Sequence, residues 1–465
     1  MKTIFCSAEQ WAEEQFGGIG LGDRRRTRRL VKVAGRLAEH PSGTLPGALP
    51  SWNELKGAYR LFSNRHVNYA AILQQHCQQT LQECCQAGEY LLIEDRSCLD
   101  YSSHRATEGL GRIGNDRGAG FLLHTTLAVR VEQDSATEPL QVVGLLGQSC
   151  RARKGTSARA KKERWRQRLS RPRESEHWAE VLSLLPKAPE SVRWIYVADR
   201  ESDIYEVFER CAAAGVDFIV RAQFARALAQ EDRSVFEAVK AVPAIGRFEM
   251  QLRTRGETLA RTATLEVRSC RVRLRGVWRP GGNRPDQELK VVEVCEETIN
   301  PPIRWVLLTS LPCETLEQAR QIAMRYARRW LIEEYHKALK SGANVEESQL
   351  ESAHALQSLL GILAVAAVRL LNMKLWANRQ PQQKIPPQAV GAEELSLLTA
   401  EFGAPIGGWT YGNTLIAIAR MGGFLARKND GSPGWITIWR GWQRLNTMAQ
   451  GVRALLSKNN PHHCG

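Results

Sequence analysis

The sequence lacks the features of an exported or membrane-spanning protein. Residues 1–6 hold too short an apolar stretch for a signal peptide. The longest apolar run, residues 359–368, falls well short of the ~20 residues that cross a bilayer. The 11 cysteines contain no CxxC pair, which favours reduced thiols over a disulfide framework. We therefore expect a soluble, cytoplasmic protein with no membrane partner.

Acidic residues are outnumbered, with 49 Asp and Glu against 64 Lys and Arg, for a net charge of +15. Two short windows carry this excess: residues 24–36 have seven basic residues and no acid, and residues 151–173 have 11 basic residues and one acid. Together they hold +17, which leaves −2 on the rest of the chain. Concentrated positive charge favours a polyanionic partner such as nucleic acid. A hydrophobic content of 43% excludes a mostly disordered chain, and 465 residues suggest about three domains.

The N-terminal part is predicted to be helical. Asp23 is a suitable N-cap, and apolar residues then recur at helical spacing from Leu30 to Ala38. A second amphipathic helix is expected around residues 55–62. The first turns of the first helix are unusually basic, with arginines at positions 24, 25, 26, 28 and 29. Positive charge there opposes the helix dipole, so either a phosphate ligand explains it or these side chains form a solvated face.

The middle of the chain is predicted to be rich in strands. Short apolar runs indicate buried strands at residues 90–93, 121–131, 140–146, 194–198, 218–220 and 305–310. Residues from about 247 to 300 alternate as β structure, which we interpret as an insertion. The basic window 151–173 is predicted to be a loop or a solvated helix.

The C-terminal third is predicted to be helical again. Thr315 opens a capping box with Gln318, and one long helix is expected from there to about Lys340, with Gly342 as its C′ residue. A second helix should cover residues 352–375, followed by a linker marked by prolines 381, 386 and 387. The last segment places an apolar stripe on one helix face, formed by Trp435, Ile438, Trp439, Trp442 and Leu445.

Three acids stand where chemistry is expected. Asp95 and Asp199 directly follow apolar strands, and a strand end holds a side chain rigidly at an edge that a ligand can reach. Glu333 lies on the predicted long helix, within an arc of about 60° that also holds Tyr326, Arg329 and Lys340. Three carboxylates suit two divalent ions for phosphoryl transfer, and hard oxygen ligands suit Mg²⁺ or Mn²⁺.

These segments together resemble the DDE transposases of bacterial insertion sequences, and among them the insertion-sequence-four type that includes the Tn-five transposase. The resemblance is carried by the runs Ile93-Glu94-Asp95 and 198–205, and by the complete signature Tyr326-x2-Arg329-x3-Glu333-x6-Lys340. The segments 21–30, 57–60 and 416–424 also look like the family's end-binding and C-terminal regions. Arg96 departs from the small hydroxyl residue that related sequences have after the aspartate, and such a cation could pair with Asp95 or with a phosphate.

The resemblance implies an α/β fold: a ribonuclease-H-like (retroviral-integrase-like) catalytic core with a β-strand insertion, flanked by helical N- and C-terminal domains. The implied domains are an end-binding domain over residues 1–70, a catalytic domain over 71–375 with its insertion at about 225–300, and a dimerisation domain over 376–465. The implied metal-binding catalytic triad is Asp95, Asp199 and Glu333, with two Mg²⁺ or Mn²⁺ ions. DNA contacts are implied for Tyr326, Arg329, Lys340, Trp305 and Arg221, and the charge pattern adds Arg25, Arg26, Arg28 and Arg29.

The implied function is cut-and-paste DNA transposition by two-metal phosphoryl transfer: end nicking, hairpin formation and opening, and strand transfer. Its partners are double-stranded DNA, as transposon ends and target, and a second copy of the chain in a synaptic complex. Two alternatives stay open: a catalytically silent, transposase-derived DNA-binding protein, and a metal-dependent nuclease that does not join strands.

Two other motifs are not expected to bind cofactors. Residues 109–114 match G-x-G-x-x-G but follow no predicted strand, so dinucleotide binding is not expected. Glu333-x-x-His336 is a lone di-iron half-site, so di-iron binding is not expected either.

Overall fold

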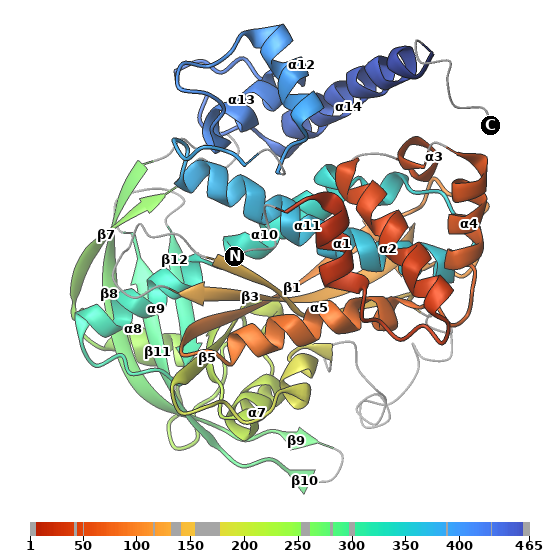
Figure 1. Cartoon of the computed structure of the whole chain (residues 1–465). Coiled ribbons are helices and arrows are strands. Elements are labelled where there is room, and N and C mark those ends of the chain that lie inside the picture. The colour runs from red at the N-terminus through yellow and green to blue at the C-terminus, as the bar shows by residue number, and fades with distance from the viewer. Residues whose placement is uncertain are drawn as a thin grey trace.

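The computed structural model describes residues 6–40, 44–49, 51–114, 117–131, 141–153, 177–252, 261–279, 282–296, 303–386, 389–428 and 430–458. A large twisted sheet occupies the middle of the molecule, with helices packed on it and helical regions at both ends of the chain (Figure 1). The fold is therefore mixed α/β with helical N- and C-terminal regions, as expected.

The N-terminal region contains five helices that precede the first strand. Asp23 caps α2 as predicted, because its carboxylate accepts a hydrogen bond from the Arg25 backbone N–H at 2.8 Å. The buried residues of α2 are Leu30, Val33, Ala34, Gly35 and Leu37, which is the helical spacing found in the sequence. The helices are α1 (Ala8–Phe16), α2 (Arg24–Glu39), α3 (Leu45–Ala48), α4 (Trp52–Phe62) and α5 (Tyr69–Cys84).

The main sheet has ten strands, in the order β2-β3-β1-β5-β6-β12-β11-β8-β7, with β4 paired to β3. Strand β1 pairs parallel with β5, and β5 pairs parallel with β6, whereas the other pairings in this sheet are antiparallel. The central strands are β1 (Gly88–Asp100), β3 (Gly118–Val131), β4 (Gln141–Arg151), β5 (Val192–Ala198), β6 (Asp217–Arg221) and β12 (Arg304–Thr309). All the strands predicted from apolar runs are present.

The predicted β insertion adds three strands, β7, β8 and β11, to the main sheet, whereas its strands β9 and β10 pair with each other in a separate two-stranded sheet. Strand β12 pairs with β6 on one side and with β11 on the other, so the inserted strands extend the same surface (Figure 1). The elements are α8 (Val235–Ala241), β7 (Gly246–Leu252), β8 (Arg261–Leu274), β9 (Trp278–Arg279), β10 (Gly282–Asn283) and β11 (Gln287–Cys295).

Alternation along β1 divides the core into two layers. Leu91 and Ile93 point into one apolar cluster, together with the helices that follow β12, and Tyr90 and Leu92 point into another with α7 (Tyr205–Ala214). Successive strand residues face opposite sides, so this pattern also sets the sides of the residues that follow Ile93.

The predicted long helix is interrupted, which corrects the sequence interpretation. Helix α9 (Leu316–Ala327) opens with the predicted Thr315–Gln318 capping box, but it ends before Arg328, and α10 (Trp330–Lys337) follows. The Arg329 N–H bonds the Tyr326 carbonyl at 2.9 Å, three residues back, which tightens the chain at the break. A short π-helix, η5 (Ala338–Gly342), follows α10, and there the helical turn is wider: the Ala343 N–H donates to the Ala338 carbonyl, five residues back, at 2.7 Å.

Gly342 is not the C′ residue that we predicted. It belongs to η5, and the left-handed residue is Asn344, with φ of 50°. A Cβ added at Gly342 would lie 3.4 Å from both the Leu370 and the Trp435 side chains, so its packing against these neighbours favours a small residue.

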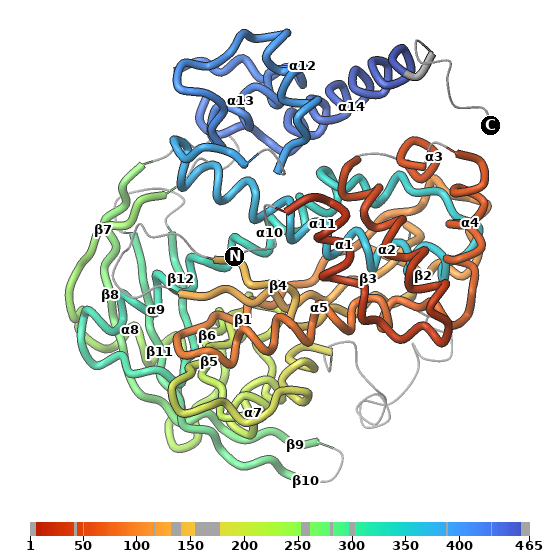
Figure 2. The backbone as a smooth tube through the Cα atoms, in the orientation of Figure 1, coloured from red at the N-terminus to blue at the C-terminus, as the bar shows by residue number. Residues whose placement is uncertain are grey.

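The remaining helices are α11 (Ala353–Arg379), α12 (Ala392–Phe402), α13 (Tyr411–Met421) and α14 (Trp435–Lys458). By length and composition α11 is able to cross a membrane, yet 83% of its apolar window is buried inside the protein, as in the core helix of a folded domain. The backbone trace shows α12, α13 and α14 gathered at one end of α11 (Figure 2). Residues 383–385 of the predicted linker pair with residues 409–411 through the Ile385 N–H and the Tyr411 N–H.

Candidate active site

Asp95 and Asp199 lie at a fork between two parallel strands. The last paired residues of β1 and β5 are Glu94 and Ala198, and each aspartate directly follows one of them. Beyond this point β1 continues along β3, whereas β5 ends and the short helix η4 (Arg200–Ser202) begins. Asp199 caps η4, since its Oδ1 accepts the Glu201 N–H at 2.8 Å. The two aspartates are thus neighbours on adjacent strands, as the strand-end pattern suggested.

Helix α10 brings Glu333 to the same fork through Arg329. The Arg329 guanidinium lies 3.1 Å from Asp95 Oδ2 and 2.5 Å from Glu333 Oε1, and thus bridges the two carboxylates. This guanidinium is largely buried, which strengthens both ion pairs relative to a surface position. Two residues of the four-residue signature, Arg329 and Glu333, are therefore linked by direct contacts to each other and, through Arg329, to Asp95.

The neighbouring charges affect the ionisation of Asp95. Burial raises the pKa of Asp95 to about 6, Arg329 opposes the rise, and Asp199 and Glu333 add to it. Like charges that share a site make ionisation harder, and a cation placed among them relieves this cost. In this structure Arg329 is the cation that does so.

The donor set suits a hard divalent cation, because all three side chains offer carboxylate oxygens. Within the described part of the chain, however, no three His, Cys, Asp or Glu side chains are already gathered around a metal-sized point. The Arg329 bridge explains this, since the guanidinium lies between Asp95 and Glu333. The residues therefore fit a metal in kind, and binding one requires Arg329 to move or to share its position.

An aromatic wall borders the site. The rings of Trp305 on β12 and Tyr326 on α9 meet edge to face, with centroids 5.2 Å apart. Arg221, at the end of β6, lies near Tyr326 and donates to the Arg304 carbonyl at 2.9 Å. Tyr326 is buried, and burial raises the pKa of its hydroxyl, whereas the nearby Arg221 lowers it. Tyr326 was expected on the same helix face as Arg329, Glu333 and Lys340, but it lies on the buried face of α9 together with Ala319, Ile322 and Ala323.

Lys340 lies apart from Arg329, along the same side of β1. Its Nζ donates to the Cys98 carbonyl at 2.5 Å and lies 3.6 Å from Glu346 Oε1. Because the π-helix follows α10, Lys340 reaches the strand three residues past Asp95. The side chain is partly exposed there, at 30%.

Two acids beside the triad were not singled out from the sequence. Glu94 is buried on the opposite face of β1, where it accepts the Ala179 N–H at 3.0 Å, and burial raises its pKa to about 8. Glu201 pairs with Arg96, whose Nη2 lies 2.8 Å from Glu201 Oε2. Arg96 thus pairs with Glu201, a partner that the sequence analysis did not name, and its pairing with a phosphate stays a prediction. Strand alternation was a usable signal, because it places residues 94 and 96 on the side away from Asp95.

His336 has a structural position. It is buried, its Nε2 lies 3.2 Å from Thr125 Oγ1, and burial lowers its pKa to about 3. Thr125 in turn is the residue of β3 that pairs with Asp95. A di-iron site is therefore excluded for His336, which is a neutral histidine that connects α10 to the sheet.

The G-x-G-x-x-G segment contains β2 (Gly111–Ile113), which pairs with β3, and it does not form a strand-to-helix turn.

A second basic site lies between α2 and α4. A cavity of about 300 Å³ is lined by Arg25, Arg26, Arg29, Arg60, Leu61 and Asn64. The Arg29 guanidinium passes so close to Gly57 that a Cβ there would lie 3.1 Å from it. Arg26 donates to the Leu21 carbonyl at 2.9 Å and Arg25 pairs with Asp23, so both also have local partners. Arg28 is exposed and is not among the lining residues. Arg60, on α4, was not predicted as a site residue.

The other basic window falls largely outside the described residues. Of residues 151–173, the structure describes 151–153, and Arg151 pairs with Glu180 at 2.6 Å.

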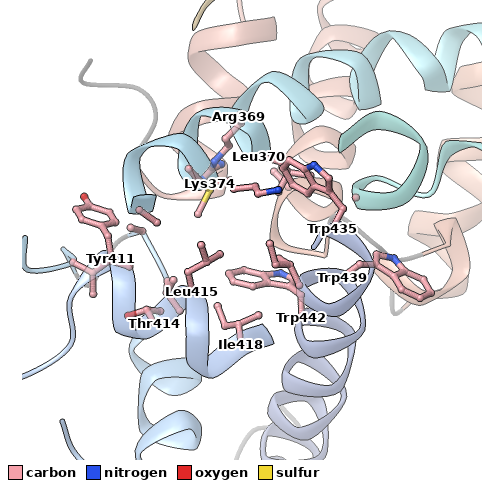
Figure 3. A pocket seen from close by; sticks show the side chains of 18 of the residues that line it. Arg369, Leu370, Lys374, Tyr411, Thr414, Leu415, Ile418, Trp435, Trp439 and Trp442 are labelled. Carbon is pink, nitrogen blue, oxygen red and sulfur yellow. The ribbon is translucent and has the colours of Figure 1, made fainter. Parts of the chain in front are cut away.

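The C-terminal helices enclose an apolar cavity against α11 (Figure 3). Four residues of the predicted apolar stripe line this cavity: Trp435, Ile438, Trp439 and Trp442. Trp435 also reaches α10, because its Nε1 donates to Glu334 at 3.0 Å, and Lys374 lies 3.2 Å from the same carboxylate. The residue next to Glu333 is therefore held by the C-terminal region.

Comparison with known families gives three matches in chain order. The family model described as transposase DNA-binding matches residues 8–67, and the one described as transposase DDE domain matches residues 169–369. The model described as transposase Tn5 dimerisation domain matches residues 405–460. The DDE match includes Asp199 and Glu333 and begins after Asp95.

The chain is a DDE transposase, an enzyme that acts on DNA and depends on a divalent metal. With the DNA-binding and dimerisation matches on either side, it belongs to the bacterial transposases of the Tn5 type, the insertion-sequence-four group. DNA and a second copy of the chain are its partners.

Proposed function

We propose that the chain carries out cut-and-paste transposition with Asp95, Asp199 and Glu333 as its catalytic carboxylates. The observation that carries this proposal is the fork between β1 and β5, where two aspartates are neighbours and Arg329 ties Glu333 to one of them. The paired parallel and antiparallel strands around β1 support a ribonuclease-H-like core. The catalytic domain then covers residues 71–375, with its insertion at about 225–300.

The three carboxylates would hold two Mg²⁺ or Mn²⁺ ions, which when bound supply Lewis acidity at the attacking and leaving oxygens of the phosphodiester. The chain's own residues position the DNA. Arg329, Lys340 and Arg221 offer cations near the fork for backbone phosphates. Trp305 offers a partly exposed ring on which an unstacked base can lie, with Tyr326 supporting it from the core.

The proposed reaction has four steps at one site. Water hydrolyses one strand at the transposon end, and the freed 3′-hydroxyl attacks the opposite strand to form a hairpin. A second water opens the hairpin, and the 3′-hydroxyl then attacks target DNA. Each step is an in-line displacement at phosphorus in which the bond to a 3′-oxygen breaks and that oxygen leaves as a 3′-hydroxyl, so one arrangement of residues serves all four.

The N-terminal region, residues 1–70, is proposed to bind the inverted-repeat end through its basic cavity. Arg25, Arg26 and Arg29 meet Arg60 there, and backbone phosphate is the ligand that converging arginines at a helix N-terminus fit best. Arg28, exposed on the same helix, is proposed as a further phosphate contact. Residues 376–465 are proposed to pair two copies in the synaptic complex. We place this chemistry in the cytoplasm, at the nucleoid.

The deciding experiment supplies the purified chain with DNA that carries the inverted repeats flanking its gene, together with Mg²⁺ or Mn²⁺ and a target plasmid. We expect end cleavage, a hairpin intermediate and covalent joining of 3′ ends to the target. Binding without cleavage would favour a silent DNA-binding protein. Cleavage without joining would favour a nuclease.

A further inference from the structure

Arg96 and Glu201 connect the two segments that diverge beyond the fork. The last paired residues of β1 and β5 are Glu94 and Ala198, and the chains separate immediately afterwards. Arg96 Nη2 lies 2.9 Å from Glu201 Oε1 and 2.8 Å from Oε2. The pair thus spans the fork one residue past Asp95 and two past Asp199.

The backbones of the same two residues hold the aspartates. The Arg96 N–H donates to Asp95 Oδ1 at 2.8 Å, and the Glu201 N–H donates to Asp199 Oδ1 at 2.8 Å. Each residue therefore contacts one aspartate through its backbone and the other residue through its side chain. The result is an unbroken chain of contacts, Asp95–Arg96–Glu201–Asp199.

This link lies on the opposite side of β1 from Arg329. Leu91 and Ile93 face the layer that contains α10, and Leu92 faces the other layer. By the same alternation Asp95 faces α10 and Arg96 faces away. The link therefore restrains the aspartates from the side of β1 opposite to α10 and leaves the α10 side to Arg329, metal and DNA.

We propose that the Arg96–Glu201 pair is a positioning device that fixes the spacing and orientation of the Asp95 and Asp199 carboxylates for divalent-metal binding. This inference rests on the proposed function of the two aspartates. Residues that orient metal ligands from behind typically change affinity 10–100-fold when altered. The pair itself is partly exposed, at 28% and 45%, so its loss costs the fold little.

The test is a calorimetric titration of MnCl₂ into the full chain without DNA, for R96Q, E201Q and the double variant. If the pair positions the aspartates, each single variant should bind Mn²⁺ about tenfold more weakly than the wild type. The double variant should bind Mn²⁺ no more weakly than either single variant, because both changes break the same link. A simple charge effect predicts opposite signs, because R96Q removes a repelling cation and E201Q removes an attracting anion. Tighter binding by R96Q overturns the proposal.

The matched control is R193Q. Arg193 pairs with Asp217 at 2.8 Å with similar exposure, but at the other end of β5. It should leave both Mn²⁺ affinity and the melting temperature unchanged, and R96Q and E201Q should also melt like the wild type.

End cleavage is measured in parallel to separate the two proposals. If the wild type cleaves and joins DNA but R96Q and E201Q bind Mn²⁺ normally, the positioning role of the pair is overturned and the proposed transposition is not. A wild type that binds Mn²⁺ but cleaves no end DNA overturns the function, while the comparison of affinities still tests the link. A wild type that binds no Mn²⁺ overturns both.

Discussion

Arg329 reaches from α10 to Asp95, with Nη1 lying 3.1 Å from Oδ2. The other end of the same guanidinium touches Glu333. A tethered cation thus stands among the carboxylates that we propose to bind metal. It keeps like charges together when no metal is bound, and it competes with a metal for the same oxygens.

Neutral replacements of the triad should separate DNA binding from chemistry. We expect D95N, D199N and E333Q each to lower end cleavage by at least about 10³-fold, because a lost carboxylate removes a metal ligand and its charge. Gel-shift affinity for end DNA should stay within about twofold. E317Q, an acid on α9 that pairs with Arg320, is the control and should cleave normally. Metal-dependent cleavage by any of the three variants would exclude that residue from the triad.

Removal of the tethered cation should change how metal binding depends on pH. Arg329 opposes the rise in the Asp95 pKa to about 6, so R329Q should move this pKa higher. Protons then compete with Mn²⁺ up to a higher pH, and the affinity of R329Q should still climb between pH 6 and 7.5, where that of the wild type levels off. Titrations with MnCl₂ at several pH values measure this.

The control for this prediction is R325Q, which breaks an ion pair with Glu89 at the far end of β1. Its pH profile should overlay that of the wild type. At pH 8.5, where protons no longer compete, R329Q should bind Mn²⁺ more tightly than the wild type. Weaker binding there would show that Arg329 orients the carboxylates instead of competing with metal.

Truncation of Trp305 should affect the hairpin step more than the first nick. Stacking of a base on an aromatic ring contributes about 1–3 kcal/mol, so W305A should slow hairpin formation roughly 5- to 100-fold. W305F retains a ring and should lose much less. Gel analysis of nicked and hairpin products, with 2-aminopurine at the end of the DNA, reports both steps. Equal slowing of nick and hairpin would argue against a stacking role.

The basic cavity should set the salt dependence of end binding. If Arg29 and Arg60 each contact a phosphate, R29Q/R60Q should reduce the slope of log affinity against log salt by about 2. R36Q, at the last turn of α2 where it pairs with Glu39, serves as the control. An unchanged slope in the double variant would show that these arginines form a solvated face and do not contact phosphates.

Glu94 should make the fold less stable as pH rises. Its pKa is raised to about 8 from an ordinary 4.5, so the folded chain holds a proton that the unfolded chain has lost. The unfolding free energy should therefore fall between about pH 4.5 and 8, by at most about 1.4 kcal/mol per pH unit. E94Q should remove this part of the slope, measured by urea unfolding at pH 6 and pH 8. Parallel slopes for both proteins would show that Glu94 is ionised in the fold.

Patterns among neighbouring residues predicted the helices and strands well, but they did not predict where the helix after Thr315 is interrupted. The Asp23 cap, the Thr315 capping box and the apolar strands depend on neighbouring residues, and all are present. The break at residues 328 and 329 depends on contacts across the molecule: Arg329 bonds Asp95, which is 234 residues away in the chain. Helical spacing alone could not reveal it.

Asp95 and Asp199 were singled out because strand ends are visible in a sequence, whereas the pairing of Arg96 with Glu201 could not be predicted from the sequence. That pair joins residues 105 apart, and it depends on β1 and β5 being neighbours in a parallel register. The segment 57–60 was singled out by its resemblance to the family's end-binding region, but Arg60 itself was not named as a site residue, since only the packing of α4 on α2 brings it to the other arginines. Long-range register is the information that the sequence pattern lacks.

The order of strands in the sheet also fixes when the site can exist during synthesis. Strand β1 lies between β3 and β5, and β6 is completed on its far side by β12, which ends at Thr309. Glu333 leaves the ribosome later still, and Trp435, which holds its neighbour Glu334, a further hundred residues on. The helices of the basic cavity are complete by residue 62. A growing chain therefore passes through a long interval in which the residues of the basic cavity have been synthesised but the carboxylates that we propose as catalytic cannot yet be assembled.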